Sequence, residues 1–164
     1  MTTTATSRTH SWAPPTVPPG ELSGLEFLHE MIEGRIPAPP IAGTLGFTLV
    51  RVEPGLAVFE GETGEHLYNP IGSVHGGYYA TLLDSALGCA VMTRLPAGAG
   101  YTTTNLTVHM VRPAFAHTGT LRCEGTVLHV GRSIATAEAR IVGAADGKLY
   151  AHGTTTCAIF PIAP

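Results

Sequence analysis

The chain has 164 residues, of which 13% are charged, and its formal net charge at pH 7 is −3. This length suits one domain with a substantial hydrophobic core. The near-neutral balance and the lack of lysine or arginine runs exclude the basic surfaces that bind nucleic acids or anionic membranes. So little charge also favours self-association, and no apolar run is long enough for a transmembrane helix.

Two features of the sequence bear on where the protein works and where its domain begins. Residues 1–20 are rich in threonine and proline and lack the apolar core of a secretory signal, so we predict a disordered or loosely docked tail and a single domain over residues 21–164. Cys89, Cys123 and Cys157 are far apart and form no CxxC pair. Such cysteines are typical of free thiols in a reducing cytoplasm, where we place the protein.

The first predicted elements are a helix and a hairpin. Leucines recur at helical spacing over residues 21–34, which predicts a short amphipathic helix. A proline-rich connector is expected over residues 35–43. Two strand-like runs, 45–53 and 56–63, are joined by a Pro-Gly turn, and a loop follows over residues 65–73.

The rest of the chain is one apolar helix followed by strands. The apolar run from His75 to Leu95 is far longer than a typical strand, so we predict a helix despite its glycines. Four segments rich in β-branched residues come next, at 101–113, 119–131, 133–144 and 148–160. Antiparallel strands around one buried helix predict an α+β domain in which a curved sheet wraps that helix.

A single carboxylate, Asp84, lies inside the apolar helix. It shares a stripe of small residues with Gly77, Thr81 and Gly88, at spacings of three, four and seven. Asp84 could simply accept a hydrogen bond from a strand or lie at a solvent edge. Because aspartate is a poor mid-helix residue and is rarely buried without a task, we predict that Asp84 is functional.

The start of the same helix, His75-Gly76-Gly77, carries a second signal. Backbone N–H groups of a first helical turn lack intrahelical partners, and the helix dipole favours negative charge there. Gly76 and Gly77 could therefore present donors to a carbonyl oxygen or oxyanion, although two glycines also suit a tight turn against a strand.

The spacing of these two signals predicts an oligomer. Gly76 and Asp84 are eight residues apart in the chain, which corresponds to about 12 Å along a helix. One substrate carbonyl cannot easily contact both groups of one chain. If both act on it, one must come from a neighbouring subunit across a two-fold axis.

Other catalytic chemistries find little support in the sequence. It contains no GxSxG motif and no GxGxxG or Walker-type loop, and its eight histidines lack metal-ligand spacing. We expect neither a metal nor a separate cofactor.

The motif Asn-Pro-x-Gly-x-x-His-Gly-Gly at 69–77, followed by Ala-Thr-Leu-Leu-Asp-Ser-Ala at 80–86, resembles that of the hotdog-fold acyl-CoA thioesterases. Within them it is most similar to the branch of the phenylacetate-pathway and 4-hydroxybenzoyl-CoA thioesterases whose acid lies on the central helix, and the resemblance covers residues 45–160. It implies a hotdog fold, a homodimer or homotetramer, and hydrolysis of an aryl or short- to medium-chain acyl-CoA to free acid and coenzyme A. Coenzyme A would be part of the substrate.

The resemblance also implies roles for particular residues. Asp84 would be the nucleophile or the general base on water, the N–H of Gly76 would polarise the thioester carbonyl, and Asn69 would orient substrate or water. The other implied catalytic residues are His75 and, from the Thr102–Thr104 run, preferably Thr103. The implied contacts to substrate or coenzyme A are Gly77, Tyr78, Thr102, Arg112, Gly131, Arg132 and Ser133. The acyl pocket is expected to draw on Tyr78, Tyr79, Leu82, Met92 and the loop at Leu67 and Tyr68.

Two alternatives stay open. Acyl-CoA hydratases and dehydratases of the same fold place an aspartate and a histidine a few residues apart around the loop, whereas the acid–histidine neighbours in this loop are Glu65 and His66. A non-catalytic acyl-CoA sensor would use the same pocket, but the retained Asp84 and the lack of a basic N-terminal helix favour an enzyme. The acyl group and the choice between dimer and tetramer stay open too.

Overall fold

The computed structural model describes residues 6–14 and 20–162, so the predicted tail over residues 1–20 lies partly outside the described residues. Helix α1 (Gly24–Ile32) confirms the predicted amphipathic helix and begins with a capping box between Ser23 and Glu26. Helix α2 (Pro40–Leu45) corrects the prediction of a plain connector over 35–43. Pro40 occupies the first helical position, where a missing N–H costs nothing and the fixed φ suits a helix.

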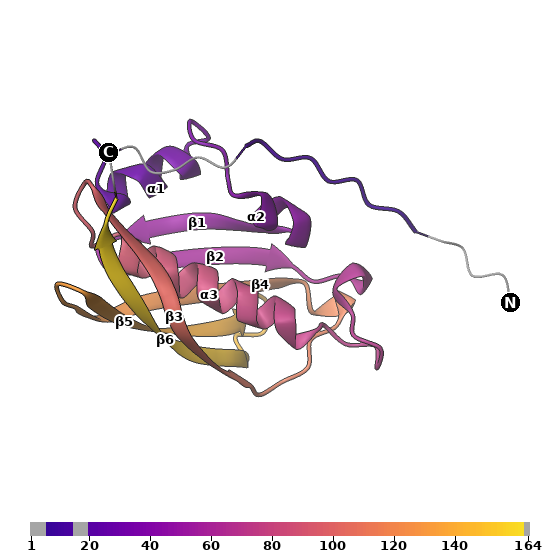
Figure 1. The fold of residues 1–164 in the computed structure, drawn as a ribbon. Helices are drawn as coiled ribbons and strands as arrows, with labels where there is room; N and C mark the ends of the chain where they lie inside the picture. The colour runs from indigo at the N-terminus through magenta and orange to yellow at the C-terminus, as the bar shows by residue number, and fades with distance from the viewer. Residues whose placement is uncertain (1–5, 15–19, 163–164) are drawn as a thin grey trace, which may run out of the picture.

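Six antiparallel strands form one curved sheet around the central helix α3 (Gly76–Met92), as Figure 1 shows. The strands are β1 (Phe47–Glu53), β2 (Leu56–Glu62), β3 (Ala99–Met110), β4 (Thr120–Val130), β5 (Ile134–Gly143) and β6 (Leu149–Pro161). Short 3₁₀ turns lie at Glu65–Leu67 and Ala116–Thr118. The strand order is β1-β2-β4-β5-β6-β3, which leaves β1 and β3 as edges. This confirms the predicted α+β architecture.

The central helix lies against a band of small residues that crosses the sheet. Its members are register neighbours on β2, β4, β5 and β6: Ala57, Gly125, Ala139 and Gly153. A Cβ atom on Gly125 would lie 2.5 Å from the carbonyl oxygen of Ala86 in α3. The helix backbone therefore approaches the sheet closely because this strand position carries no side chain.

Helix α3 buries its apolar side against the sheet and turns a different side towards the space between the sheet edges. The fully buried side chains are Leu82, Leu83, Ala86, Leu87, Ala90 and Val91. Burial of each leucine contributes about 1.5–3 kcal/mol. Asp84, Ser85, Cys89 and Met92 are only half-buried. No helix within residues 6–14 and 20–162 is long and apolar enough to cross a membrane.

Candidate active site

A cavity of about 850 Å³ lies beside the half-buried side of α3. One wall comes from Asp84, Ser85, Cys89 and Met92 of α3, and another comes from residues 99–103 at the start of β3. The other lining residues come from helices α1 and α2, the connector between them, strands β1 and β2, and the end of the chain at β6. Of the described residues that line the cavity, Asp84 alone is charged, so the site combines one carboxylate with mainly apolar walls.

The carboxylate of Asp84 is held by Thr103. The hydroxyl of Thr103 donates to Asp84 Oδ1 at 2.8 Å. Strand β3 has a bulge between Thr103 and Asn105, so Thr104 is the extra residue, and its hydroxyl donates to the Thr156 carbonyl at 3.0 Å. Thr102 also lines the cavity. The structure thus brings Thr103 to Asp84 and turns Thr104 towards β6.

Asn69 organises the loop that leads into α3. Its Oδ1 accepts hydrogen bonds from the backbone N–H groups of Ile71 at 3.1 Å and Ser73 at 3.2 Å. Its Nδ2 donates to the Ser73 hydroxyl at 3.0 Å. Both ends of the amide are therefore engaged within the loop, as in an Asx turn. Asn69 therefore positions the loop that ends at His75.

His75 is the N-cap of α3, and it changes which donors the helix presents. Its Nδ1 accepts from the Gly77 N–H at 2.8 Å. A ring nitrogen that accepts a hydrogen bond carries no proton, so the ring N–H lies on Nε2 in this arrangement. The N–H of Gly76 has no hydrogen-bond partner among the described residues. The helix therefore presents one free donor, from Gly76, because His75 already occupies the N–H of Gly77.

Met110, which sequence reasoning missed, covers the first turn of α3. A Cβ atom on Gly76 would lie 2.6 Å from Met110 Sδ. The hydroxyl of Tyr79 donates to the Arg112 carbonyl at 3.3 Å, which holds the segment after β3 beside the same turn. No local pattern marks a methionine at a strand end, so only the packing of β3 against α3 reveals this contact.

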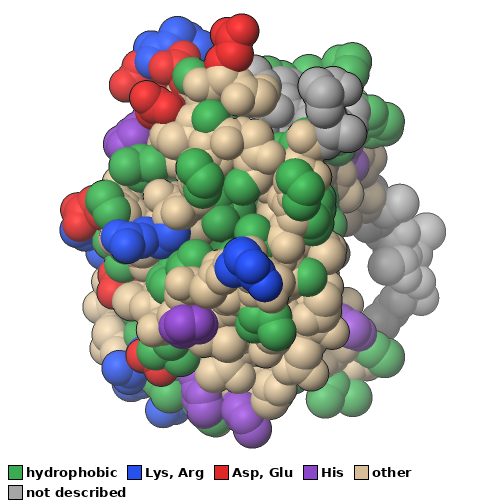
Figure 2. Space-filling model, turned by 60° about the vertical axis from the view of Figure 1, so that its left-hand side comes forward, with side chains coloured by type: hydrophobic (Ala, Val, Ile, Leu, Met, Phe, Trp, Pro, Cys, Tyr) green, Lys and Arg blue, Asp and Glu red, His purple; other side chains and the backbone are tan. Residues whose placement is uncertain are grey.

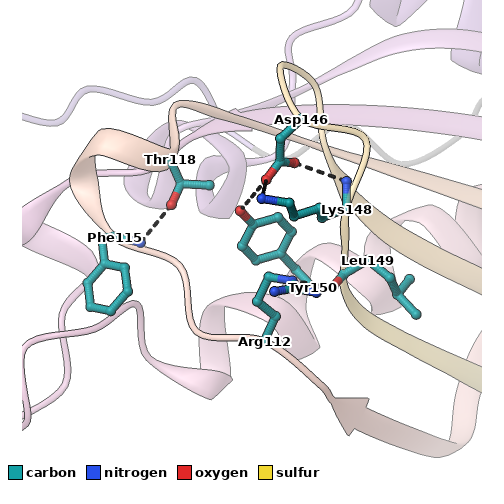
Figure 3. Close-up of polar contacts among 7 residues, drawn as sticks. All are labelled: Arg112, Phe115, Thr118, Asp146, Lys148, Leu149 and Tyr150. Carbon is teal, nitrogen blue, oxygen red and sulfur yellow. Dashed lines mark hydrogen bonds and ion pairs between the residues drawn. The ribbon is translucent and has the colours of Figure 1, made fainter.

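Arg112 is anchored where β6 begins, as Figure 3 shows. Its Nε donates to the Leu149 carbonyl at 3.2 Å, and its guanidinium lies 5.9 Å from the centre of the Tyr150 ring. The Tyr150 hydroxyl donates to Asp146 Oδ2 at 3.1 Å. Hydrogen bonds from the Lys148 N–H and from Tyr150 hold the pKa of Asp146 below its usual range. This network fixes Arg112 at the same end of the molecule as Gly76.

The turn Gly131-Arg132-Ser133 lies at the other end of β6. The Gly131 N–H donates to the Ile134 carbonyl at 2.8 Å, and the Ser133 carbonyl accepts from the Ile159 N–H at 2.9 Å. Arg112 packs near Tyr150 of β6, and Tyr150 lies nine residues before Ile159 on that strand. Nine strand residues span about 30 Å, so Arg112 and the turn are far apart. Arg112 and this turn are therefore separate candidates for a phosphate contact.

Tyr78 points away from the cavity. It is six residues before Asp84, or about 120° around the helix, and only 3% of it is exposed. Its hydroxyl packs against Gly61, where a Cβ atom would collide with it, and burial raises the pKa of Tyr78 to about 12. Of the side chains expected to form an acyl pocket, only Met92 lines this cavity.

Cys89 lines the cavity close to Asp84 but is poorly suited to act as a nucleophile. Burial raises the pKa of its thiol to about 12, so the thiol is protonated near neutral pH. All three cysteines are free. Among the described residues there is no group of three His, Cys, Asp or Glu side chains that could hold a metal ion. Asp84 is therefore the side chain best placed to act as a base or nucleophile in the cavity.

Comparison with known proteins places the chain in a family. Residues 71–150 match the Thioesterase superfamily. The chain is 30% identical over 130 residues to human acyl-coenzyme A thioesterase 13, and this alignment covers 79% of the chain and 91% of the human protein. The chain belongs to the thioesterase superfamily. A stretch of 77 residues is also 42% identical to a Halobacterium salinarum protein named as an esterase, over 46% of this chain and 49% of that protein.

Solved structures of the superfamily share the fold of this member. A phenylacetic acid degradation-related protein from Ralstonia eutropha is 32% identical with a TM-score of 0.73, and the match covers 80% of this chain and 98% of that one. The E. coli PaaI protein of the phenylacetic acid degradation operon shares the fold at 24% identity and the same TM-score of 0.73, over 86% of this chain and 97% of that one. These matches confirm the predicted hotdog fold and the resemblance to the phenylacetate-pathway branch.

Proposed function

We propose that this protein is a cytoplasmic acyl-CoA thioesterase that hydrolyses its substrate to a free acid and coenzyme A. The observation that carries the proposal is Asp84, held by Thr103 at 2.8 Å and set in a mainly apolar cavity. Membership of the superfamily supports thioester hydrolysis, and the similarity to acyl-coenzyme A thioesterase 13 supports an acyl-CoA substrate. The three free thiols support a reducing location.

The residues at hand suffice for this chemistry. A thioester is already activated, because sulfur donates electrons poorly to the carbonyl and leaves as a stable thiolate. The Thr103 hydroxyl engages Asp84 Oδ1, which leaves Oδ2 to take a proton from water or to attack the carbonyl carbon directly. The free N–H of Gly76 would stabilise the resulting oxyanion, which then collapses and expels the coenzyme A thiolate. If water attacks, the collapse leaves the free acid directly. If Oδ2 attacks, the collapse leaves a mixed anhydride of the acyl group with Asp84, which water then hydrolyses to the free acid and the Asp84 carboxylate.

The Asp84 and Gly76 that act on one carbonyl would belong to different protomers of a homodimer, either alone or as half of a homotetramer. Strand β3 is an edge strand of 12 residues, with Thr103 and Asp84 near its start and Met110 and Gly76 at its end. Antiparallel pairing of two copies of β3 would bring the end of one beside the start of the other. Each Asp84 would then face the Gly76 of the second copy, with Arg112 of that copy nearby for a phosphate.

The surface supports such an assembly. On the face shown in Figure 2, charged side chains gather mainly at the top and along one side, and the middle carries only isolated basic and histidine side chains among hydrophobic and uncharged groups. Met110, the last residue of β3, is 52% exposed, and Val111, which follows it, is 54% exposed. Exposed apolar side chains on a free strand edge are typical of a surface that pairs with a partner.

The proposed function is tested by incubating the protein with acetyl-, octanoyl-, palmitoyl-, benzoyl- and phenylacetyl-CoA and measuring thiol release. We expect hydrolysis of at least one of them. Tight binding without hydrolysis of any of them would contradict the proposal and support a sensor. Sedimentation measures the number of subunits in the oligomer. Thiol release after mixing Asp84→Asn subunits with Gly76→Pro subunits tests the shared site. Activity should return in the mixture, because each mixed dimer would contain one site with both an intact Asp84 and an intact Gly76.

Thr103→Val is expected to lower the kcat for acyl-CoA hydrolysis by roughly 10- to 100-fold with little change in KM. Valine keeps the shape of threonine but removes a hydrogen bond to a charged group, which is worth about 1.5–3 kcal/mol. Steady-state kinetics measure the effect. Thr104→Val is the matched control, because the Thr104 hydroxyl bonds to β6 outside the cavity. Equal losses in the two variants would contradict a role for Thr103 in holding Asp84.

A further inference from the structure

We infer that the cavity beside Asp84 binds the hydrocarbon chain of a medium-chain fatty acyl-CoA and that Met92 sets the longest chain it accepts. The inference rests on the proposed function, because it takes the thioester carbonyl to lie at Asp84. It adds the class of acyl group and the residue that limits the length of that group.

The cavity has a polar end and an apolar body. Asp84 and Thr103 form the polar end. The Tyr101 ring, two residues before Thr103 on β3, packs on Gly88, four residues after Asp84 on α3. A Cβ atom on Gly88 would lie 2.7 Å from the Tyr101 hydroxyl oxygen. From the polar end, α3 and the start of β3 therefore run side by side in opposite directions. The thiol of Cys89, which is neutral because burial raises its pKa to about 12, forms the next part of the wall. A chain that starts at Asp84 therefore meets only uncharged groups as it follows α3 towards Met92.

The length of this path favours a medium chain. Asp84 and Met92 are eight residues apart on α3, or about 12 Å. An extended polypeptide advances roughly 3.3–3.6 Å per residue of three backbone bonds, or about 1.2 Å per bond. A hydrocarbon chain that advances by the same distance per bond would place about ten carbons along this path. An aryl group such as phenylacetyl is much shorter than this path and would not reach from Asp84 to Met92, both of which line the cavity.

At the far end of the path from Asp84, α1 docks on the end of α3. The Gly24 N–H donates to the Leu95 carbonyl at 3.0 Å, and a Cβ atom on Gly24 would collide with the Met92 carbonyl. The Met92 side chain also lies at this junction, with its Cγ atom 2.9 Å from the position that a Cβ atom on Gly24 would take. Phe27 and Met31 of α1 also line the cavity. These backbone contacts hold α1 against the end of α3, so we take the Met92 side chain as the limit on chain length.

The first test is the dependence of kcat/KM on chain length in the wild-type protein, from acetyl- to palmitoyl-CoA, with phenylacetyl-CoA as the aryl substrate. Each methylene that enters the cavity should raise kcat/KM by up to about fourfold. We expect a rise to about ten carbons and no gain beyond. A flat profile, or a preference for phenylacetyl- over decanoyl-CoA, would overturn the inference.

The second test changes the size of the side chain at position 92. Met92→Ala removes three heavy atoms and is expected to shift the longest chain that still raises kcat/KM by about three carbons, whereas Met92→Phe should shorten it. Ile134→Ala is the control, because Ile134 is 52% exposed on β5 and does not line the cavity. Its profile should match the wild type. A Met92→Ala profile with an unchanged optimum would overturn the role of Met92.

Binding separates this inference from the proposed function. The Asp84→Asn protein, whose kcat is expected to be at least about 100-fold lower than that of the wild type, should bind decanoyl-CoA at least tenfold more tightly than acetyl-CoA in calorimetry. Equal affinities would overturn the inference and leave thioester hydrolysis by the wild type untouched. If the wild type hydrolyses no thioester but decanoyl-CoA still binds more tightly, the proposed function fails and the chain-binding cavity stands.

Discussion

Asp84→Asn is expected to lower the kcat for acyl-CoA hydrolysis by about 10²- to 10⁴-fold, the usual contribution of a general acid or base. Asparagine has nearly the same shape, and its Oδ1 can still accept the Thr103 hydroxyl, which lies 2.8 Å from Asp84 Oδ1. It can neither take a proton from water nor attack a carbonyl. Thiol release under steady-state conditions measures kcat, and a thermal melt checks that the fold is retained.

Glu138→Gln is the control for this variant. It makes the same chemical change at an exposed position on β5 that does not line the cavity. We expect its kcat to equal that of the wild type. An Asp84→Asn protein that keeps more than about a tenth of the wild-type kcat would show that another group activates the water.

Gly125→Ala is expected to lower the free energy of unfolding by about 2–3 kcal/mol, the upper part of the range for overpacking. The added Cβ would lie 2.5 Å from the Ala86 carbonyl oxygen and 2.6 Å from its carbonyl carbon. Both partners are backbone, so relief requires α3 to move off the sheet. For a chain of this size we expect the Tm to fall by roughly 4–12 °C. Urea denaturation and calorimetry measure the two quantities.

Gly43→Ala provides a contrast of opposite sign. Gly43 lies within α2, and its Cβ would meet only the Ser11 carbonyl oxygen at 3.7 Å, an ordinary contact. Alanine is a better helix former than glycine by roughly 0.5–1 kcal/mol, so this variant should gain stability. If both substitutions changed the free energy of unfolding by less than 0.5 kcal/mol, close backbone contact at Gly125 could not be what holds α3 against the sheet.

The helices and strands were predictable where a local pattern repeats. The apolar run of α3 and the β-branched segments of β3 to β6 reflect burial on one face, and that burial follows from residue spacing alone. Helix α2 was missed because prolines dominate its surroundings and its six residues are too few for a periodic signal. The strand order could not be obtained from the same patterns, since β3 pairs with β6, more than 40 residues away, through contacts that no local spacing encodes.

The candidate site, like the fold, was only partly predictable from the sequence. Asp84 could be singled out as a candidate because a carboxylate in an apolar helix is anomalous in the sequence itself, and the free N–H of Gly76 follows from helix geometry. Tyr78 was expected at the substrate, but its angle around α3 sends it beneath β2. His75 was expected near the thioester, and its contact with the Gly77 N–H depends on a side-chain conformation that the sequence does not specify.

The sequence by itself determined the elements, the lone carboxylate on the central helix and the glycines at the start of that helix, because each depends on residues close together in the chain. Only the tertiary structure decided that Thr103 of β3 meets Asp84, that Met110 covers Gly76, and that α1 docks against Met92 beside the cavity. Those contacts join segments far apart in the chain. They depend on how the sheet curves around α3, which is set by packing across the whole domain.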